Sequence, residues 1–342
     1  MKVLLTGGTG FLGRSVAGRL LAGGHDLRLL VRASSDVGGL PAAAERVHGD
    51  VTDPGSLTAA MAGCDTVVHA AALVKILAPA RQFDRVNVEG LDNVLAASRD
   101  AGVERVLYVS SFIALGPTEE LPGGAAGEEA EPLGPHGGAA GGGGRWINDY
   151  ERTKTEADRR ARRAIAEGAP LVVVYPGVVY GPGAMTEGNI LVRHLLDLAH
   201  GRLPGLLGSP ERRWSYAYVD DVAAGLVAAL EGAEPGSRWV LGGDNVELGR
   251  FYELVREVGG IEVPKRRIPD AVAKTAGLLA REWARWTGGT PQITPDLVEV
   301  YRHDWALDSS AAERALGYRP RPLAEGLQAT VAWLREEGAW PH

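Results

Sequence analysis

A phenol and an ammonium stand one helical turn apart in the stretch NDYERTKTEADRRARR, residues 148 to 163. On a helix, Tyr150 and Lys154 would project from the same face. A nearby ammonium lowers the pKa of a phenol, which can then move a proton at the oxygen of a carbinol or carbonyl group. The pair therefore predicts Tyr150 as an acid/base that Lys154 activates. The alternative is a solvated helix face, since charges of both signs surround the pair.

The elements that would position this pair follow an alternating order. Apolar runs of strand length are separated by helix-like stretches such as residues 54 to 62 and 83 to 100; the runs are KVLLT, DLRLLV, TVVHAA, RVLYVS and LVVVYP. This order predicts an α/β fold, a Rossmann-type doubly wound parallel sheet. Ser111 ends the fifth strand, at the edge where such sheets bind ligands, and would either hydrogen-bond a substrate oxygen or cap the next turn.

A glycine-rich turn follows the first predicted strand in LLTGGTGFLGRSVAGRLL. Gly8, Gly10 and Gly13 would permit a tight turn and let the backbone approach a pyrophosphate at the start of a helix. Because the pattern lies between a strand and a helix, it predicts dinucleotide binding. The expected cofactor contacts in this turn are Gly7, Thr9, Gly10, Phe11, Leu12 and Gly13.

Residues at the ends of later strands bear on which dinucleotide binds. Arg32 stands where an NAD-preferring site would place an acid, so we favour NADP(H), with NAD(H) possible. Asp50, followed by Val51, would accept from the adenine amino group, or it is a strand-end cap; Asp53 is the cap candidate for the next helix. The small side chains Ala70, Ala71 and Ala72 would let a flat cofactor lie across the sheet edge.

Composition narrows the partners of the chain. Its 342 residues carry a net charge of −7, which disfavours nucleic acid and fits a small-molecule substrate. The single cysteine, Cys64, excludes an internal disulfide and suits packing, and His69 is predicted to be a core residue without a metal. No stretch has the length of a signal peptide or membrane span, so we expect a cytoplasmic protein without stable membrane insertion. A homodimer is possible.

Two further segments allow more than one interpretation. Residues 123 to 144, rich in Gly and Ala, predict a mobile loop that is either a tolerated insertion or an active-site lid. One apolar helical stripe follows near the C-terminus: Val272, Ala276, Leu279, Trp283 and Trp286. We expect this stripe to form a core face of a small helical domain, with a lipophilic pocket or a membrane surface as alternatives.

The motifs together resemble a known family. TGGTGFLG, GDVTD, HAAA, NVEG, SSF, YERTK, YPGVVYGPG and YVDDVA stand in the order of the extended short-chain dehydrogenases/reductases, the NAD-dependent epimerase/dehydratase-like proteins. The chain looks most similar to farnesol dehydrogenases and dihydroflavonol-4-reductase-like proteins. The resemblance implies that Ser111, Tyr150 and Lys154 are catalytic, that Pro176 lies near the nicotinamide and that Asn87 lies near the active site.

Departures from the nucleotide-sugar epimerases of this family concern the substrate. Val178 replaces an Asn that holds the nucleotide diphosphate in those relatives, and Trp214 aligns with an Arg, although Arg213 lies beside it. Sugar dehydratases place an acidic pair where Phe112 follows Ser111, so dehydration is disfavoured. Phe112, Val178, Trp214 and Asn87 are therefore the predicted substrate residues.

The interpretation is an NAD(P)-dependent oxidoreductase that interconverts an alcohol and a carbonyl on a fairly apolar molecule, such as a prenyl alcohol or a flavonoid- or steroid-like ketone. The alternatives are a nucleotide-sugar epimerase and a non-catalytic NAD(P)-sensing regulator. We expect a dinucleotide-binding domain from residues 1–175 plus about 213–243. A smaller, mostly helical substrate domain would comprise about 176–212 plus 244–342.

Overall fold

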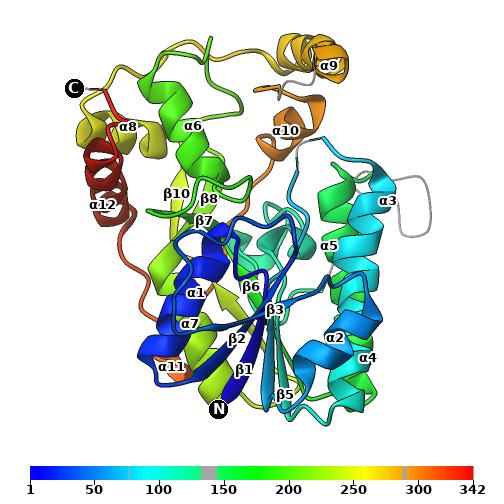
Figure 1. Ribbon diagram of the computed structural model, residues 1–342. Helices are drawn as coiled ribbons and strands as arrows, with labels where there is room; N and C mark the ends of the chain where they lie inside the picture. Colours follow the sequence, from blue (N-terminus) through cyan, green and yellow to red (C-terminus); the bar gives the residue numbers. More distant parts are fainter. Residues whose placement is uncertain (76, 132–144, 288–290, 342) are drawn as a thin grey trace.

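The computed structural model describes residues 1–75, 77–131, 145–287 and 291–341 (Figure 1). A seven-stranded parallel sheet with the order β3-β2-β1-β4-β5-β6-β9 forms its centre. The strands are β1 (Lys2–Thr6), β2 (Asp26–Val31), β3 (Glu45–His48), β4 (Thr66–His69), β5 (Arg105–Val109), β6 (Leu171–Pro176) and β9 (Arg238–Leu241). The strand order reverses between β1 and β4, which is where doubly wound folds bind their ligands. The predicted α/β fold is confirmed.

Helices cover both faces of this sheet (Figure 1). On one face α1 (Phe11–Ala22) packs against α7 (Val219–Gly232), and α11 (Ser310–Ala315) contacts β9. On the other face lie α2 (Pro54–Met61), α4 (Gly90–Asp100) and α5 (Asp149–Ala166). Asp53 caps α2, as predicted, by accepting a hydrogen bond from the N–H of Gly55. Because both faces are covered, the central strands are mostly apolar runs rather than alternating ones, whereas the edge strand β3 is largely exposed.

The helix predicted over residues 83 to 100 is interrupted in register. It begins as α3 (Ala80–Phe83), continues as a π-helical turn (Asp84–Glu89) and ends as α4. Short 3₁₀ turns follow β5 at Phe112–Leu115 and occur at Pro122–Gly124. π-Helical turns are rare and are enriched at functional sites.

A smaller body with its own sheet stands at the carboxyl edge of the large sheet (Figure 1). Its three strands, in the order β10-β8-β7, are β7 (Val178–Tyr180), β8 (Arg213–Tyr218) and β10 (Asp244–Glu247). Its helices are α6 (Ile190–Ala199), α8 (Leu248–Gly259), α9 (Asp270–Thr287), α10 (Pro295–Val300) and α12 (Leu323–Glu336). β8, which begins the second stretch assigned to the dinucleotide-binding domain, pairs in this sheet.

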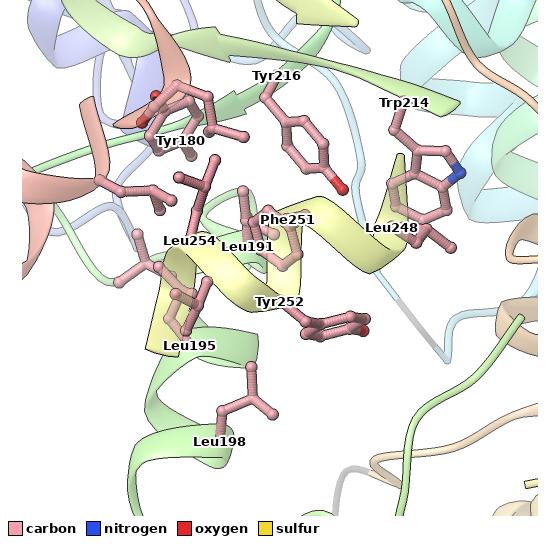
Figure 2. Packing of buried hydrophobic residues seen from close by; sticks show 14 of the residues in the cluster. Tyr180, Leu191, Leu195, Leu198, Trp214, Tyr216, Leu248, Phe251, Tyr252 and Leu254 are labelled. Carbon is pink, nitrogen blue, oxygen red and sulfur yellow. Dashed lines mark hydrogen bonds between the residues drawn. The ribbon is translucent and has the colours of Figure 1, made fainter. Parts of the chain in front are cut away.

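Aromatic and aliphatic side chains together form the core of the smaller body (Figure 2). The ring of Tyr216 on β8 stacks on Phe251 of α8 with centroids 4.7 Å apart, and Trp214 lies 4.6 Å from the ring of Tyr301. Leu191, Leu195 and Leu198 of α6 complete the cluster from the other side. Such rings bury a large area, so they fix the positions of β7 and β8 next to the large sheet.

The apolar stripe on α9 contradicts one prediction. Leu279, Trp283 and Trp286 are 69%, 71% and 89% exposed, and Val272 and Ala276 are also exposed. The prediction of a core face was wrong because the opposite face of α9, with Ala273, Gly277 and Ala284, is the buried one. Small side chains let α9 approach α10 closely, and the larger side chains remain outside.

Candidate functional site

A capping arrangement fixes the start of α5 and thereby the position of Tyr150. The Asn148 side chain accepts from the backbone N–H of Glu151 at 2.8 Å, and the Glu151 carboxylate accepts from the N–H of Ile147 at 2.6 Å. These bonds satisfy donors that the first helical turn leaves unpaired. Tyr150 therefore lies in the first turn of α5, beside the carboxyl ends of β5 and β6.

Ser111 and Tyr150 meet at this edge of the sheet. Ser111 is buried, accepts a long 3.4 Å hydrogen bond from the N–H of Ile113 and caps the 3₁₀ turn after β5. Burial raises the pKa of the Tyr150 phenol, and a hydrogen bond with the Ser111 hydroxyl opposes this rise. The capping role predicted for Ser111 is confirmed, and its contact with Tyr150 places it beside the predicted acid.

Lys154 lies one turn further along α5 and is almost completely buried. Its ammonium donates to the carbonyl oxygen of Val109 at 3.0 Å and lies 5.1 Å from the centre of the Tyr108 ring. Burial lowers the pKa of Lys154 to about 7, an effect that the negative charge of Asp158 opposes. The predicted lowering of the Tyr150 pKa differs from the structure, where burial raises it, because loss of water disfavours the charged form of both groups.

The predicted cofactor turn is closed by direct backbone contact. Gly7 has φ +78°, and a side chain there would meet the backbone of Ala70 at 2.6 Å. At Gly13 a methyl group would lie 2.1 Å from the carbonyl oxygen of Gly7. Gly10 begins α1 without any side-chain cap, so the first N–H groups of the helix remain available to an anion. These residues fit the pyrophosphate of a dinucleotide.

The loop after β2 is held by a residue that the sequence analysis missed. Arg14, directly after Gly13, donates to the carbonyl oxygens of Thr9 at 3.2 Å and Asp36 at 3.1 Å, and also to that of Gly38. Arg32 is exposed at the start of this loop. An arginine in the first turn of the helix is the only signal in the sequence, and the partners of Arg14 are backbone atoms that sequence patterns do not reveal.

Asp50 and Val51 follow β3, the last strand at one end of the large sheet. One carboxylate oxygen of Asp50 accepts from the N–H and the hydroxyl of Thr52, both at 2.9 Å. Val51 is buried, and its carbonyl accepts from Asn93 of α4 at 2.9 Å. This is the local turn that the alternative reading of Asp50 expected, and it leaves the second carboxylate oxygen for another donor.

Asn87 connects the segment after β4 with α5. Its side-chain oxygen accepts from the N–H of Leu73 at 2.7 Å, and its amide nitrogen donates to the Leu73 carbonyl and to the Thr153 hydroxyl, at 3.3 and 3.1 Å. The π-helical turn brings Asn87 to this position. Asn87 therefore fixes the backbone at Leu73, while the N–H of Ala71 donates to the Thr6 hydroxyl at the end of β1 at 3.3 Å.

The predicted substrate residues gather around the aromatic core. Phe112 contacts Trp305 edge to face at 5.5 Å, and Val178 and Tyr150 pack against the same cluster. Trp214 is buried and donates its indole N–H to the carbonyl of His303 at 3.1 Å. Pro176 ends β6, two residues before Val178 begins β7. Phe112, Tyr150 and Val178 therefore border one apolar cluster that includes Trp214, and Ser111 contacts Tyr150.

The two arginines before Trp214 have partners of their own. Arg213 donates to the carbonyl oxygen of Gly124 at 3.1 Å, and Arg212 lies 3.5 Å from the carboxylate of Asp304. Most of the loop predicted as a lid, residues 132–144, lies outside the described residues. His69 and Cys64 are buried, as predicted; the His69 ring shares a 2.8 Å hydrogen bond with the Thr6 hydroxyl.

Two further features, a metal site and a membrane-spanning helix, are absent from the described residues. Within the described ranges, no three His, Cys, Asp or Glu side chains gather where they could hold a metal ion. Among the same residues, every helix is too short or too polar to cross a membrane.

Comparison with known proteins agrees with this geometry. A model of the NAD dependent epimerase/dehydratase family matches residues 3–242. Sterol demethylase protein B of Methylococcus capsulatus is 31% identical over 345 residues, which covers 99% of both chains. A 4-hydroxy-2-methyl-3-oxo-4-farnesyl-3,4-dihydroquinoline-1-oxide ketoreductase of Stigmatella aurantiaca is 31% identical and covers 100% of this chain and 99% of its own. The crystal structure of gox2253 superimposes with a TM-score of 0.80 at 30% identity, covering 99% of each chain.

This chain belongs to the NAD dependent epimerase/dehydratase family. The predicted resemblance to extended short-chain dehydrogenases/reductases is confirmed, and the protein is an NAD(P)-dependent enzyme of that type. When bound, the nicotinamide of such a cofactor gives or accepts a hydride.

Proposed function

We propose that this enzyme interconverts an alcohol and a carbonyl on a fairly apolar small molecule, with a preference for NADP(H). One observation carries the proposal: Tyr150, Phe112 and Val178 pack against a single apolar, aromatic-rich cluster. Binding sites for small molecules are mostly apolar, with few polar groups that fix orientation. Here Ser111 and Tyr150 would be those polar groups.

In the reducing direction, Tyr150 donates its proton to the carbonyl oxygen while Ser111 donates a hydrogen bond to the same oxygen. The raised pKa of Tyr150 keeps the phenol protonated, as an acid must be before the reaction. With the cofactor bound, Lys154 would hold the nicotinamide ribose, and Pro176 would line the site of the nicotinamide. Oxidation of the alcohol follows the same path in reverse.

The arginine pattern supports an apolar substrate over a nucleotide sugar. A diphosphate needs charged donors to replace its water, and Arg212 and Arg213 already bind Asp304 and the Gly124 carbonyl. Names of relatives point the same way, since they refer to a sterol and to a farnesyl-bearing ring. For the cofactor, exposed Arg32 is the group we assign to the 2′-phosphate of NADP.

The proposed domain division places the cofactor on residues 1–175 plus about 213–243 and the substrate on the remainder. A substrate panel tests the function: oxidation of NADPH and reduction of NADP⁺ are followed with prenyl, aromatic, steroid and nucleotide-sugar compounds. We expect turnover with the apolar alcohols or ketones only. Calorimetry with UDP on the cofactor-loaded enzyme is the counter-test, and micromolar binding that Arg213→Ala abolishes would favour an epimerase instead.

A further inference from the structure

The large apolar side chains of α9 face solvent, whereas a core helix would bury them. Its α9 stripe, the outward face made by Val272, Ala276, Leu279, Trp283 and Trp286, is exposed along its length, and the neighbouring Leu278 is 46% exposed. Soluble monomers rarely leave such a contiguous patch uncovered unless it binds something. We therefore expect the α9 stripe to bind another surface.

Firm contacts hold α9 in this orientation. A methyl group at Gly277 would lie 2.9 Å from the backbone of Thr294, so the helix lies directly on the start of α10. Lys274 of α9 pairs with Glu299 of α10 at 2.6 Å. A helix held by small residues and an ion pair has no room to turn its tryptophans inward.

The positive charge of the segment before α9 indicates which kind of surface the α9 stripe would bind. The chain carries −7 in total, yet Lys265, Arg266 and Arg267 precede α9 on the same end of the molecule (Figure 1). Lys265 and Arg266 are exposed and form no ion pair with another described residue. A cationic segment before α9, a helix whose exposed tryptophans lie near its C-terminal end, matches an anionic lipid surface, because indole rings settle at the bilayer interface and ammonium groups attract acidic headgroups.

A second copy of the chain fits this region less well. A two-fold interface brings the same patch of both subunits together. Pairing through the α9 stripe would cover the tryptophans but would leave the exposed charges of Lys265 and Arg266 without an acidic partner surface. An anionic bilayer meets the tryptophans and the cationic segment together with favourable interactions.

Electrostatic interactions relate the position of α9 to that of Tyr150. Asp296 of α10 interacts electrostatically with Arg281 of α9 and with Asp149. Asp149 is the residue before Tyr150 in α5. α9 and α10 therefore lie near the start of α5, where the proposed acid is found.

We propose that α9 docks reversibly on anionic membrane surfaces, with the α9 stripe in the interface and Lys265 and Arg266 against the headgroups. Docking of this kind needs no spanning helix, since an amphipathic helix lies in the plane of the interface. The proposal does not depend on the identity of the substrate, because its test measures vesicle binding.

The test is cosedimentation of the full chain with vesicles of phosphatidylcholine alone or with phosphatidylglycerol. We expect binding to the mixed vesicles, weakened on the order of tenfold in Trp283→Ser/Trp286→Ser. Lys265→Glu/Arg266→Glu should remove the preference for phosphatidylglycerol. The matched control is Ile190→Ser, which changes a 51% exposed apolar residue outside the stripe and should bind as wild type.

Brominated lipid provides a readout on the unchanged protein, since it should quench the emission of interfacial tryptophans. Wild-type protein that remains in the supernatant with both vesicle types would overturn the proposal, as would equal binding by the double tryptophan variant. Light scattering tests the alternative that a second copy of the chain covers the stripe. A wild-type protein that is a dimer and does not bind vesicles, together with a monomeric tryptophan variant, would support that alternative.

Discussion

The ammonium of Lys154 donates to the carbonyl oxygen of Val109 at 3.0 Å, and this bond crosses from α5 to the carboxyl end of β5. A neutral acceptor partly replaces the water that the ammonium loses, and the centre of the Tyr108 ring lies 5.1 Å from the ammonium. The bond fixes where the charge lies, while burial still lowers the pKa of Lys154 to about 7.

Replacing Lys154 by Met should change how stability depends on pH. Because the folded pKa of about 7 is below the ordinary 10.5, the unfolded wild-type chain binds more protons between these values. Wild-type stability should therefore rise with pH relative to Lys154→Met, with a limiting slope of about 1.4 kcal/mol per pH unit. Below pH 7 the gap should be constant. Urea unfolding of both proteins at three pH values measures it, and a pH-independent gap would contradict the lowered pKa.

Tyr150→Phe removes the transferable proton and the hydrogen bond with Ser111 but keeps the ring that packs against the aromatic core. Turnover should fall by on the order of 10²–10⁴, while the affinity for NADPH stays nearly unchanged. Steady-state kinetics and fluorescence titration separate the two effects. Near-normal turnover on an established substrate would mean that another group moves the proton.

Asp158→Asn should lower the pKa of Lys154 further. Asp158 is completely buried, lies one turn after Lys154 and raises its pKa, while Tyr108 and His69 are the other titratable groups nearby. If turnover needs charged Lys154, activity should be lost as pH rises, and this loss should begin at a lower pH in Asp158→Asn than in the wild type. Glu156→Gln, which breaks a pair with Arg160 on the solvent side of α5, is the matched control and should keep the wild-type profile. Identical profiles for all three proteins would refute a role of Asp158 in holding the charge.

Arg32→Asp should shift the cofactor preference from NADP toward NAD, since a carboxylate repels the 2′-phosphate and accepts from a ribose hydroxyl. Arg19→Asp makes the same charge change at an exposed position of α1 and should leave the preference unchanged. The ratio of the dissociation constants for the two cofactors is the measurement. An unaltered ratio in Arg32→Asp would leave Arg32 without a role in this choice.

Gly13→Ala and Gly18→Ala make the same change in one helix with opposite expectations. The added methyl at Gly13 would lie 2.1 Å from the Gly7 carbonyl oxygen and distort the cofactor turn, so NADPH binding should be lost. At Gly18 no atom lies within 4 Å, and the variant should bind normally and gain up to about 1 kcal/mol of stability. Cofactor titration and thermal unfolding measure both, and tight binding by Gly13→Ala would exclude this turn as the cofactor site.

The central sheet was predictable because its signals are local and repeated. Each buried strand is an apolar run, and the glycines after β1 report a backbone contact that tolerates no side chain. Ser111, Tyr150 and Lys154 could be singled out as candidates because their chemistry is unusual at their positions; their catalytic roles stay a prediction.

Other features depend on packing that a single sequence does not encode locally. The periodicity of α9 indicated which residues share a face but not which face is covered, and Ala273 and Gly277 are uninformative as sequence signals. Arg14 and Asn87 bind backbone atoms, which look alike in every sequence. The direction of the Tyr150 pKa was missed because proximity to an ammonium was considered and loss of water was not.

The interleaving of the two bodies sets the order in which they can be completed during synthesis. α12, which packs against α8, is synthesised after the other described helices and strands, and Arg321 just before it pairs with Asp221 of α7 at 2.7 Å. The early strands can associate as soon as they emerge, but the aromatic core lacks one wall until α12 has been made. An incomplete core of this kind is a target for chaperones and proteases, so the chain should gain full protection only after α12 has emerged.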